Sequence, residues 1–366
     1  MNKKIRILAI NPGSTSTKIA LFDDYDEVFS ETIIHEAEEL KGFEHIQDQL
    51  GYRRDMVEKA MENRGFALSG VDVFVGRGGG IMSVTGGTYE VSALLVEHAA
   101  SGIVSNHPAQ LASQICKQFA EKYNRRAYIV NPPDVDEFED VARITGIKGI
   151  YRESHIHALN QKEIALRFCA ERGLQYEQVN LVICHLGGGI SITAHHKGRM
   201  IDSNDIIKGS GPMTPTRAGD MPYIKILDMA FSGEYTKKQL TERLNKDGGL
   251  TDHFGTTDVR DVLKLADAGD RYADVVFRGM VYQNAKYAGA MAVALKGRVD
   301  AIILTGGISN GKRVTDLMKE YIGWIAEVVV MPGELELEAL AAGAIRVMRG
   351  EEQAKVYTGA PVWNGF

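Results

Sequence analysis

Short apolar runs separated by polar turns open the chain. Residues 5–10 (IRILAI) and 17–22 (TKIALF) have the length and composition of buried strands, and residues 27–35 predict a third strand. Apolar positions in residues 44–67 recur at helical spacing, and residues 71–75 predict a further buried strand that ends in glycines. Strands mixed with helices in this order are typical of an α/β protein.

The second half of the chain repeats this arrangement. Three strands are expected between residues 180 and 202, again with small residues in the first turn, and a later strand ends at the glycines of residues 306–307. The intervals differ between the halves, which predicts an insertion around residues 205–260. We interpret the pattern as a duplicated α/β unit. The alternative is that strand–glycine–strand runs recur in any α/β protein.

Length and charge limit the possible classes of protein. The chain has 366 residues, which suggests about two domains of roughly 150 residues each, and its hydrophobic content of 44% suffices for a large core. The formal net charge is −6 without a basic block, which argues against nucleic acid or an anionic membrane as a partner.

The sequence also indicates a cellular compartment. No apolar run approaches the ~20 residues of a membrane span. The first apolar stretch is broken at Asn11 and Pro12, too early for a signal peptide, so we expect a cytoplasmic protein. Cys116, Cys169 and Cys184 share no metal-ligand spacing, and we expect buried, reduced thiols.

Two glycine turns carry more polar groups than a hairpin requires. Asn11, Ser14, Ser16 and Lys18 surround the first turn with an amide, hydroxyls, backbone N–H groups and a cation, a set that suits a phosphate. Residues 186–191 (LGGGIS) form a second turn of this kind. The alternative for each is an ordinary turn capped by hydroxyl side chains.

Residues 306–312 (GGISNGK) match the first seven positions of a P-loop. The eighth position is Arg313, where a P-loop has the Ser or Thr that binds Mg²⁺, so we interpret this segment as a near-miss. Its paired glycines still allow a flat nucleoside to approach the backbone.

Taken together, five motifs resemble the acetate and butyrate kinase family: NPGSTSTK (11–18), CHLGGGIS (184–191), MTPTRAGD (213–220), TTDVRD (256–261) and LTGGISNG (304–311). Four further segments resemble its butyrate and branched-chain fatty acid kinase branch: VGRGG (75–79), GGTYEV (86–91), HALNQK (157–162) and PGELELEALA (332–341). The motifs occur in family order from residue 11 to about residue 349.

The resemblance implies a fold. This is the duplicated actin-like ATPase fold of acetate and sugar kinases, heat-shock proteins and actin, an α/β fold with two domains around a nucleotide cleft. The first domain is expected at residues 1–150, completed by a C-terminal helix at about 338–366. The second is expected at residues 151–337, with nucleotide-binding segments and the insertion around residues 205–260.

The resemblance also implies site residues. The catalytic residues are Arg77, His157 and Arg217, of which the arginines hold the acyl phosphate and the histidine contacts the phosphoryl group. Phosphate and nucleotide binding is implied for Asn11, Ser14, Ser16, Lys18, His185, Gly187, Gly188, Gly189, Asp258, Arg260, Gly306, Gly307 and Asn310. Metal binding is implied for Glu336 and Asn11, with Glu338 as an alternative to Glu336.

The chain departs from the family at three places. Asn131 stands where the family has an aspartate, and Asp134 or Asp136 is a possible substitute. Acetate kinases have His-Asn-Pro where residues 106–108 read Asn-His-Pro, which leaves open the side chain that faces the substrate. Gly188 replaces an asparagine of acetate kinases.

The implied reaction is reversible transfer of a phosphoryl group from ATP, with Mg²⁺, to a short-chain carboxylate, with butyrate or a branched-chain acid favoured. A carboxylate is already ionised near neutral pH, so no general base is needed. Direct in-line transfer is preferred, and a phospho-enzyme stays open. The alternatives are an acetate or propionate kinase and an actin-like ATPase that acts as a binding or chaperone module.

The expected partners are a small carboxylate or acyl phosphate and further copies of the chain, in a homodimer or higher homo-oligomer. A last hypothesis concerns substrate length. Glycines follow Arg77 at residues 78–80 where acetate kinases have larger side chains, and Ile156 stands where they have phenylalanine. The missing side chains would leave space for a longer acid. The alternative is that the glycines only allow a tight backbone turn.

Overall fold

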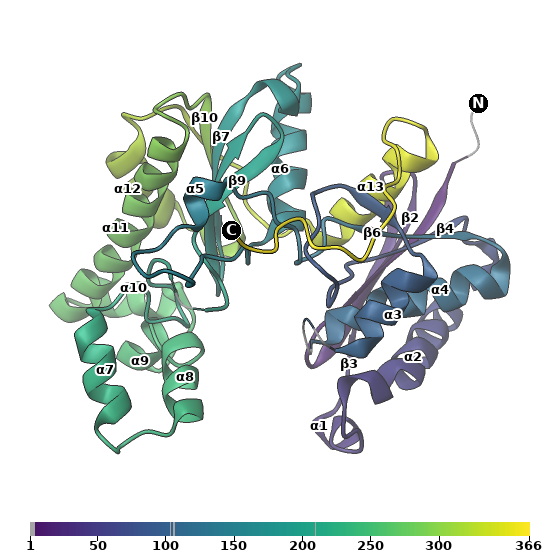
Figure 1. Cartoon of the computed structure of the whole chain (residues 1–366), viewed down its shortest axis with the longest axis horizontal. Helices are drawn as coiled ribbons and strands as arrows, with labels where there is room; N and C mark the ends of the chain where they lie inside the picture. The colour runs from purple at the N-terminus through teal and green to yellow at the C-terminus, as the bar shows by residue number, and fades with distance from the viewer. Residues whose placement is uncertain (1–3, 103, 105–106, 209) are drawn as a thin grey trace. The chain divides into compact units, whose positions relative to one another are not determined.

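The computed structural model describes residues 4–102, 104, 107–208 and 210–366 (Figure 1). Within these residues no helix has both the length and the apolar character needed to cross a bilayer. Cys116, Cys169 and Cys184 are buried and free, and burial raises the pKa of the Cys184 thiol to about 12.

The chain forms two compact units. The first contains Met1–Asp136, Ala158–Glu163 and Leu335–Phe366, and the second contains Glu137–His157 and Ile164–Glu334. Residues 137–150, expected in the first domain, lie in the second unit. The reason is local, because the Glu137 carboxylate accepts a hydrogen bond from Met200 N and Glu139 N donates to Ile201 O.

A six-stranded sheet with the strand order β3-β2-β1-β4-β6-β5 forms the centre of the first unit. Its strands are β1 (Arg6–Pro12), β2 (Ser16–Asp23), β3 (Asp26–Ile34), β4 (Val73–Gly76), β5 (Thr88–Glu90) and β6 (Arg126–Val130). β1 pairs with β2 in antiparallel orientation and with β4 in parallel. The first turn and the glycines after β4 therefore meet at one edge of this sheet.

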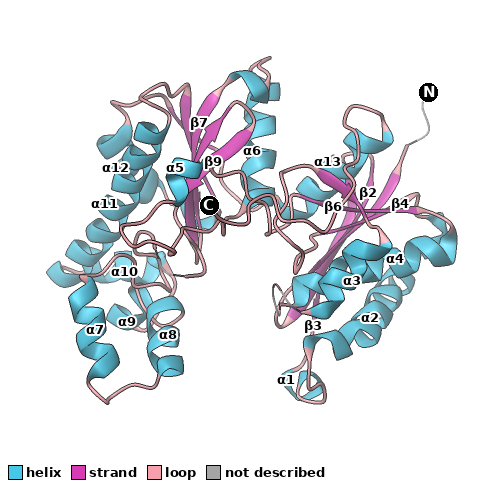
Figure 2. Ribbon diagram, viewed as in Figure 1, coloured by secondary structure: helices cyan, strands magenta, loops and turns pink. Residues whose placement is uncertain are grey.

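Helices cover both faces of this sheet (Figure 2). The α-helices of this unit are α1 (Ala37–Leu40), α2 (Leu50–Asn63), α3 (Ala93–Ser101), α4 (Leu111–Tyr123) and α13 (Glu336–Met348). α4 packs on β1, β4 and β6, and α13 packs on the opposite face over Ile7, Val73 and Val130. A Cβ atom at Gly343 would lie 2.6 Å from Val130 Cγ1, so only glycine permits this close packing.

The C-terminal helix is shorter than predicted. α13 ends at Met348, and residues 349–366 contain no helix, so the expected helix at 338–366 is wrong in its extent. Gly350, at φ +77°, takes the chain out of the helix in the left-handed region. The tail then follows the first sheet, where Lys355 N donates to Thr88 O.

The second unit has a five-stranded sheet with the order β11-β10-β7-β8-β9. Its strands are β7 (Asn180–Leu186), β8 (Ile190–His196), β9 (Arg199–Ser203), β10 (Ala301–Thr305) and β11 (Val328–Val330). β7, β8 and β9 are antiparallel, whereas β10 is parallel to β7 and to β11. This is the order and direction of β6-β4-β1-β2-β3, so the sheet topology confirms the expected duplication.

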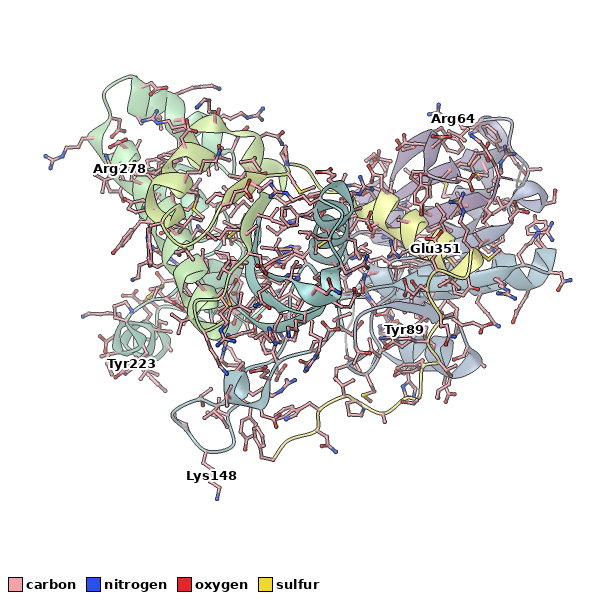
Figure 3. The ribbon with its side chains drawn as sticks, turned by 90° about the horizontal axis from the view of Figure 1, so that it is seen from above. Arg64, Tyr89, Lys148, Tyr223, Arg278 and Glu351 are labelled. Atoms are coloured by element: carbon pink, nitrogen blue, oxygen red, sulfur yellow. The ribbon has the colours of Figure 1, made fainter. Side chains whose placement is uncertain are left out.

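The remaining helices are α5 (Asp140–Arg143), α6 (Ala158–Glu171), α7 (Tyr223–Phe231), α8 (Lys237–Asn245), α9 (Leu250–Phe254), α10 (Val259–Asp267), α11 (Arg271–Ala294) and α12 (Lys312–Ile322). α7, α8 and α9 lie in the segment expected as an insertion. The Tyr223 side chain at the start of α7 is 74% exposed (Figure 3). α11 buries Phe277, Met280 and Met291 against the second core.

Candidate active site

The first polar turn connects β1 to β2 at the edge of the first sheet. Asn11, the penultimate residue of β1, is buried and pairs across the hairpin with Lys18, so the two side chains lie on one face. Ser14 and Lys18 are exposed and Ser16 is half-buried. Of the residues expected around a phosphate, Ser14, Ser16 and Lys18 are therefore accessible on this turn, whereas Asn11 is buried.

Asn11 and Arg77 both contact Glu336. Asn11 Nδ2 donates to Glu336 Oε2 at 2.6 Å, and Arg77 Nη1 lies 3.3 Å from Glu336 Oε1. Arg77 directly follows β4, and Glu336 is the first residue of α13. The structure thus groups one expected arginine with both expected metal ligands, all within the first unit.

The start of α13 is fixed by a residue that sequence reasoning did not single out. Asn160 Oδ1 accepts a hydrogen bond from Leu335 N at 2.9 Å, directly before Glu336. Glu338, the alternative metal ligand, forms no ion pair with the described residues. These contacts favour Glu336 over Glu338 as the carboxylate of this cluster.

Asn131 has a structural role. It has φ +39°, its N–H donates to Gly87 O, and its Oδ1 accepts from Gly87 N at 2.7 Å. The side-chain oxygen of Asn131 is therefore engaged with the backbone. A carboxylate oxygen of an aspartate at this position could accept the same hydrogen bond. Of the possible substitutes, Asp136 is buried, and its N–H donates to Val84 O.

His107 lies near the same cluster, whereas Asn106 is outside the described residues. His107 Nδ1 accepts from Ala109 N at 3.2 Å and caps the short helix that begins at Pro108. Burial lowers the pKa of His107, and the charges of Arg77 and Arg53 lower it further. The ring is consequently held neutral beside two guanidinium groups.

The glycines after Arg77 are required by the backbone. Gly78, Gly79 and Gly80 have φ values of +70°, +136° and +73°. A Cβ atom at Gly79 would lie 3.3 Å from Pro133 Cγ, and one at Gly78 would lie 2.9 Å from Ile129 Cδ1. The expectation that missing side chains leave open space here is wrong, because packed atoms occupy those positions.

In the second unit, two histidines stack beside the second glycine turn. The His157 and His185 rings lie 4.0 Å apart, with 19° between their planes. His157 Nδ1 is 2.8 Å from Ser191 Oγ, and His185 Nε2 is 3.7 Å from Glu334 Oε1. A Cβ atom at Gly189 would approach His157 Cε1 to 3.6 Å, so the glycine turn runs directly beside this pair.

Two threonines connect the Arg217 loop to the glycine turn. Thr214 Oγ1 and Thr216 Oγ1 donate to Gly188 O at 2.9 and 3.1 Å. Thr214 Oγ1 also accepts from Arg217 N at 3.1 Å. Sequence reasoning missed both hydroxyls, although they stand within the MTPTRAGD motif.

Arg217 is partly buried without a complete set of partners. Its Nε and Nη1 atoms are inaccessible to solvent and have no hydrogen-bond acceptor among the residues that the structure describes. Burial lowers the pKa of Arg217, an effect that nearby Asp205 opposes, but a guanidinium remains charged. A buried cation with unused donors is suited to an anionic ligand.

The residues expected to bind the nucleoside lie in two segments, 258–260 and 306–310, and the first is held by local contacts. Asp258 caps α10, where it accepts from Arg260 N, and it also pairs with the Arg260 side chain. These contacts lower the pKa of Asp258 to about 2. The Arg260 side chain is 84% exposed, and its guanidinium can leave this local pair for a ligand at small cost.

The glycines at residues 306–307 differ in environment. Gly306 has φ +85°, and a Cβ atom there would lie 2.4 Å from Leu186 O, so it permits the close approach of two strand ends. Gly307 is exposed, with no atom within 4 Å of a Cβ position. Asn310 Nδ2 donates to Gly307 O, and Lys312 pairs with Asp316 on its own helix, which agrees with a P-loop near-miss.

Comparisons with known proteins show the family to which this chain belongs. A sequence model described as "Acetokinase family" matches residues 148–327. The chain is 41% identical over 352 residues to a "Probable butyrate kinase" of Clostridium botulinum (strain Alaska E43 / Type E3), covering 96% of this chain and 99% of the relative. The chain belongs to the acetokinase family. It is also 40% identical over 354 residues to "Butyrate kinase 2" of Clostridium acetobutylicum, covering 97% and 99% of the two chains.

Solved structures of an acetate kinase and a propionate kinase share the fold. The acetate kinase of Porphyromonas gingivalis superposes with a TM-score of 0.76 at 17% identity, covering 94% of this chain and 100% of that one. A propionate kinase from Francisella tularensis gives a TM-score of 0.71 at 18% identity, with coverages of 93% and 98%. The expected duplicated actin-like ATPase fold is confirmed.

Proposed function

We propose that this acetokinase-family protein is a carboxylate kinase. It transfers a phosphoryl group reversibly between ATP and a short-chain carboxylic acid, with an acyl phosphate as the product. The observation that carries the proposal is the partly buried Arg217, whose Nε and Nη1 donors lack acceptors among the described residues. A small ligand with several oxygens, such as an acyl phosphate, satisfies such a group.

Charge neutralisation supplies most of the chemistry of phosphoryl transfer. In our proposal, Arg77 and Arg217 hold the oxygens of the acyl phosphate, and His157 donates to the phosphoryl group in flight. Ser191 supports this role of His157, since its hydroxyl lies 2.8 Å from Nδ1 and orients the ring. The substrate carboxylate attacks directly, and no side chain is needed to remove a proton.

The first unit offers one carboxylate for a nucleotide-bound cation. No group of three or more His, Cys, Asp or Glu side chains among the described residues could hold a metal by itself. Mg²⁺ in kinases commonly uses one or two carboxylates, phosphate oxygens and water, so the donor set of Glu336 and Asn11 fits it. When bound, Mg²⁺ would neutralise charge on the phosphates. Asn11 and Arg77 orient the Glu336 carboxylate for that cation.

Nucleotide binding in this proposal uses residues of the second unit. Gly307 gives a nucleoside access to backbone, because it is exposed and has no neighbour at its Cβ position. Arg260 supplies an exposed cation, and Asp258 fixes its side chain until the nucleotide binds. The Gly187–Gly189 turn and His185 contact phosphates, and Thr214 and Thr216 keep that turn in place.

We propose butyrate or a branched-chain acid as the preferred substrate. The names and 40–41% identities of the Clostridium relatives support this preference. The glycines after Arg77 do not, because packed atoms fill the space beside Gly78 and Gly79. Ile156, which is buried directly before His157, is the residue to examine for chain-length selection.

The test is a coupled assay of ADP release with Mg²⁺–ATP and acetate, propionate, butyrate or isobutyrate, with hydroxylamine to trap the acyl phosphate. Acid-dependent ADP release with a trapped hydroxamate is the expected result. ATP hydrolysis that is indifferent to every acid would instead indicate an actin-like binding or chaperone module. The expected homo-oligomer and cytoplasmic location stay predictions, which light scattering and cell fractionation test.

A further inference from the structure

Arg53 is a buried arginine on the inner face of α2. Its exposed fraction is 0%, and on the same helix Val57, Ala60 and Met61 are buried as well. Arginine is rarely buried to this extent unless its charge and its five N–H donors are accommodated. The neighbouring Arg54 shows the contrast, since it pairs with Asp55 on the exposed side of α2.

The Arg53 guanidinium is satisfied mainly by the first polar turn. Nε donates to Gln49 Oε1 at 2.9 Å. The other nitrogens donate to acceptors of the turn: Gly13 O at 2.9 Å, Ser14 O at 3.1 Å, Ser16 O at 3.2 Å and Thr17 Oγ1 at 3.1 Å. One side chain therefore fixes three backbone carbonyls within four residues.

This pattern determines the direction of the peptide groups in the turn. The remaining carbonyl, Thr15 O, accepts from His35 N, so every carbonyl of residues 13–16 is engaged within the protein. The N–H groups of the exposed Ser14 and Thr15 have no acceptor among the described residues. Because the C=O and N–H of a peptide point in opposite directions, carbonyls held inward leave N–H groups directed outward. Such outward N–H groups form an anion-binding concavity.

Arg53 also places an uncompensated charge beneath the turn. No carboxylate of the described residues lies within 4 Å of its guanidinium, and carbonyls and a hydroxyl satisfy the donors without neutralising the charge. Burial lowers the pKa of Arg53, but arginine stays protonated in proteins. The positive charge of Arg53 also acts on His107 and His35, because it helps to lower the pKa of both side chains.

A chain of hydrogen bonds supports this arrangement from behind. Tyr52 donates to Glu39 Oε2, so its oxygen accepts from His35 Nδ1 at 3.1 Å. His35 Nε2 then accepts from the Thr17 hydroxyl at 2.8 Å, which leaves the lone pairs of Thr17 Oγ1 for Arg53. The neutral state of His35 makes these directions consistent, because burial lowers its pKa to about 4.

We infer that Arg53 is a positioning residue for the phosphoryl group. It turns the carbonyls of the Gly13–Ser16 turn inward, so that the N–H groups of Ser14 and Thr15 face a phosphate, and it supplies the positive charge under that phosphate. The inference rests on the carboxylate kinase activity proposed above. It adds a residue that never touches the substrate but acts on it through four loop residues.

The test compares Arg53→Met and Arg53→Lys with a matched control, Arg346→Met. Arg346, on α13 of the first unit, is half-buried and pairs with Glu163 and with Glu352, and among the described residues no hydrogen bond or ion pair joins it to the turn. Each variant is assayed for kcat and for the KM of ATP, of butyryl phosphate and of butyrate. Melting temperatures show how much each substitution disturbs the fold.

For Arg53→Met we expect kcat to fall at least ~10-fold and the KM of ATP and butyryl phosphate to rise, with the KM of butyrate unchanged. Arg53→Lys should recover part of kcat, because it restores the charge but cannot reach several carbonyls at once. Arg346→Met should melt earlier with unchanged kcat and KM values. A folded Arg53→Met with wild-type kinetics, or with losses matched by Arg346→Met, would overturn the inference.

A second measurement separates this inference from the proposed activity. Amide hydrogen exchange of residues 11–18 is followed with and without Mg²⁺–ATP in the wild type and in Arg53→Met. Protection by ATP in the wild type that is lost in Arg53→Met supports the role of Arg53, even if no acid is phosphorylated. Equal protection in both proteins contradicts it, whatever the kinase assay shows.

Discussion

The amide of Asn11 donates a 2.6 Å hydrogen bond to the carboxylate of Glu336, across 325 positions of sequence. The other oxygen of Glu336 is 3.3 Å from Arg77. The carboxylate of the first residue of α13 therefore contacts the penultimate residue of β1 and the residue that follows β4. A substitution at any of these three positions therefore alters the contacts of the Glu336 carboxylate.

The two arginines provide the most direct test of the site. Arg77→Ala and Arg217→Ala should each lower turnover at least ~10²-fold, because each removes a fixed positive charge from the transferred phosphoryl group. Arg217→Lys should lose much of the activity as well, since a single ammonium cannot replace the fork of donors. Coupled assays at saturating ATP and acid measure the loss. Near-normal rates in both alanine variants would contradict the assignment.

Glu336 should determine the requirement for a divalent cation. Glu336→Gln removes one hard, charged oxygen, so the Mg²⁺ concentration at half-maximal rate should rise while the melting temperature changes little. Glu338→Gln, on the same helix but without an ion pair among the described residues, is the matched control and should titrate like the wild type. If Glu338→Gln raises the Mg²⁺ requirement and Glu336→Gln does not, Glu338 is the metal-binding carboxylate.

His35 should make the fold sensitive to acid. Burial and the charge of Arg53 lower its pKa to about 4 from an ordinary value of 6.5. Between these values the unfolded chain binds the proton more readily, so this contribution to stability is complete above about pH 6.5 and is lost as the pH falls towards 4. Urea midpoints between these pH values should fall less steeply for His35→Gln. The exposed His45→Gln should keep the wild-type slope, and a slope unchanged in His35→Gln would contradict the prediction.

Gly79→Val should impair the protein without changing its preference among acids. The position has φ +136°, and a Cβ atom would lie 3.3 Å from Pro133 Cγ, so the substitution strains the backbone. We expect a lower melting temperature and equal proportional losses of kcat/KM for acetate, propionate, butyrate and isobutyrate. Gly51→Ala, in α2 with no atom within 4 Å, is the glycine control. Selective loss of butyrate activity in Gly79→Val would restore the hypothesis that the glycines shape the pocket.

The residues at the ends of the expected strands predicted more of the fold and of the candidate site than any other part of the sequence. The polar turn after the first strand, the arginine after β4 and the repeated strand order could all be predicted, because apolar runs and glycines mark those points. The partner of Asn11 could not, since no local pattern connects it to a helix 325 positions away. The helix expected at about 338–366 followed from the resemblance, and Gly350 was a local signal of its early end that the prediction did not use.

Arg53 shows a signal that was present but not used. It lies three residues after Leu50 and four before Val57, on the apolar stripe of its helix, where a charged residue needs a buried partner. Arg54, one position later, lies off that stripe and is partly exposed. Three of the partners of Arg53 are backbone carbonyls of a turn, and backbone carbonyls leave no trace in a sequence. Only the three-dimensional structure could identify them.

The discontinuous first unit affects how the protein is made. Residues 137–157 and 164–334 make up the second unit, so all of that unit is synthesised before α13 of the first unit. Until then the sheet of the first unit has one uncovered apolar face, the one that Leu340, Ala344 and Ile345 later cover. The nascent chain therefore carries an aggregation-prone surface for much of its synthesis. Synthesis of α13 covers this face. Its first residue, Glu336, also supplies the carboxylate that binds Asn11.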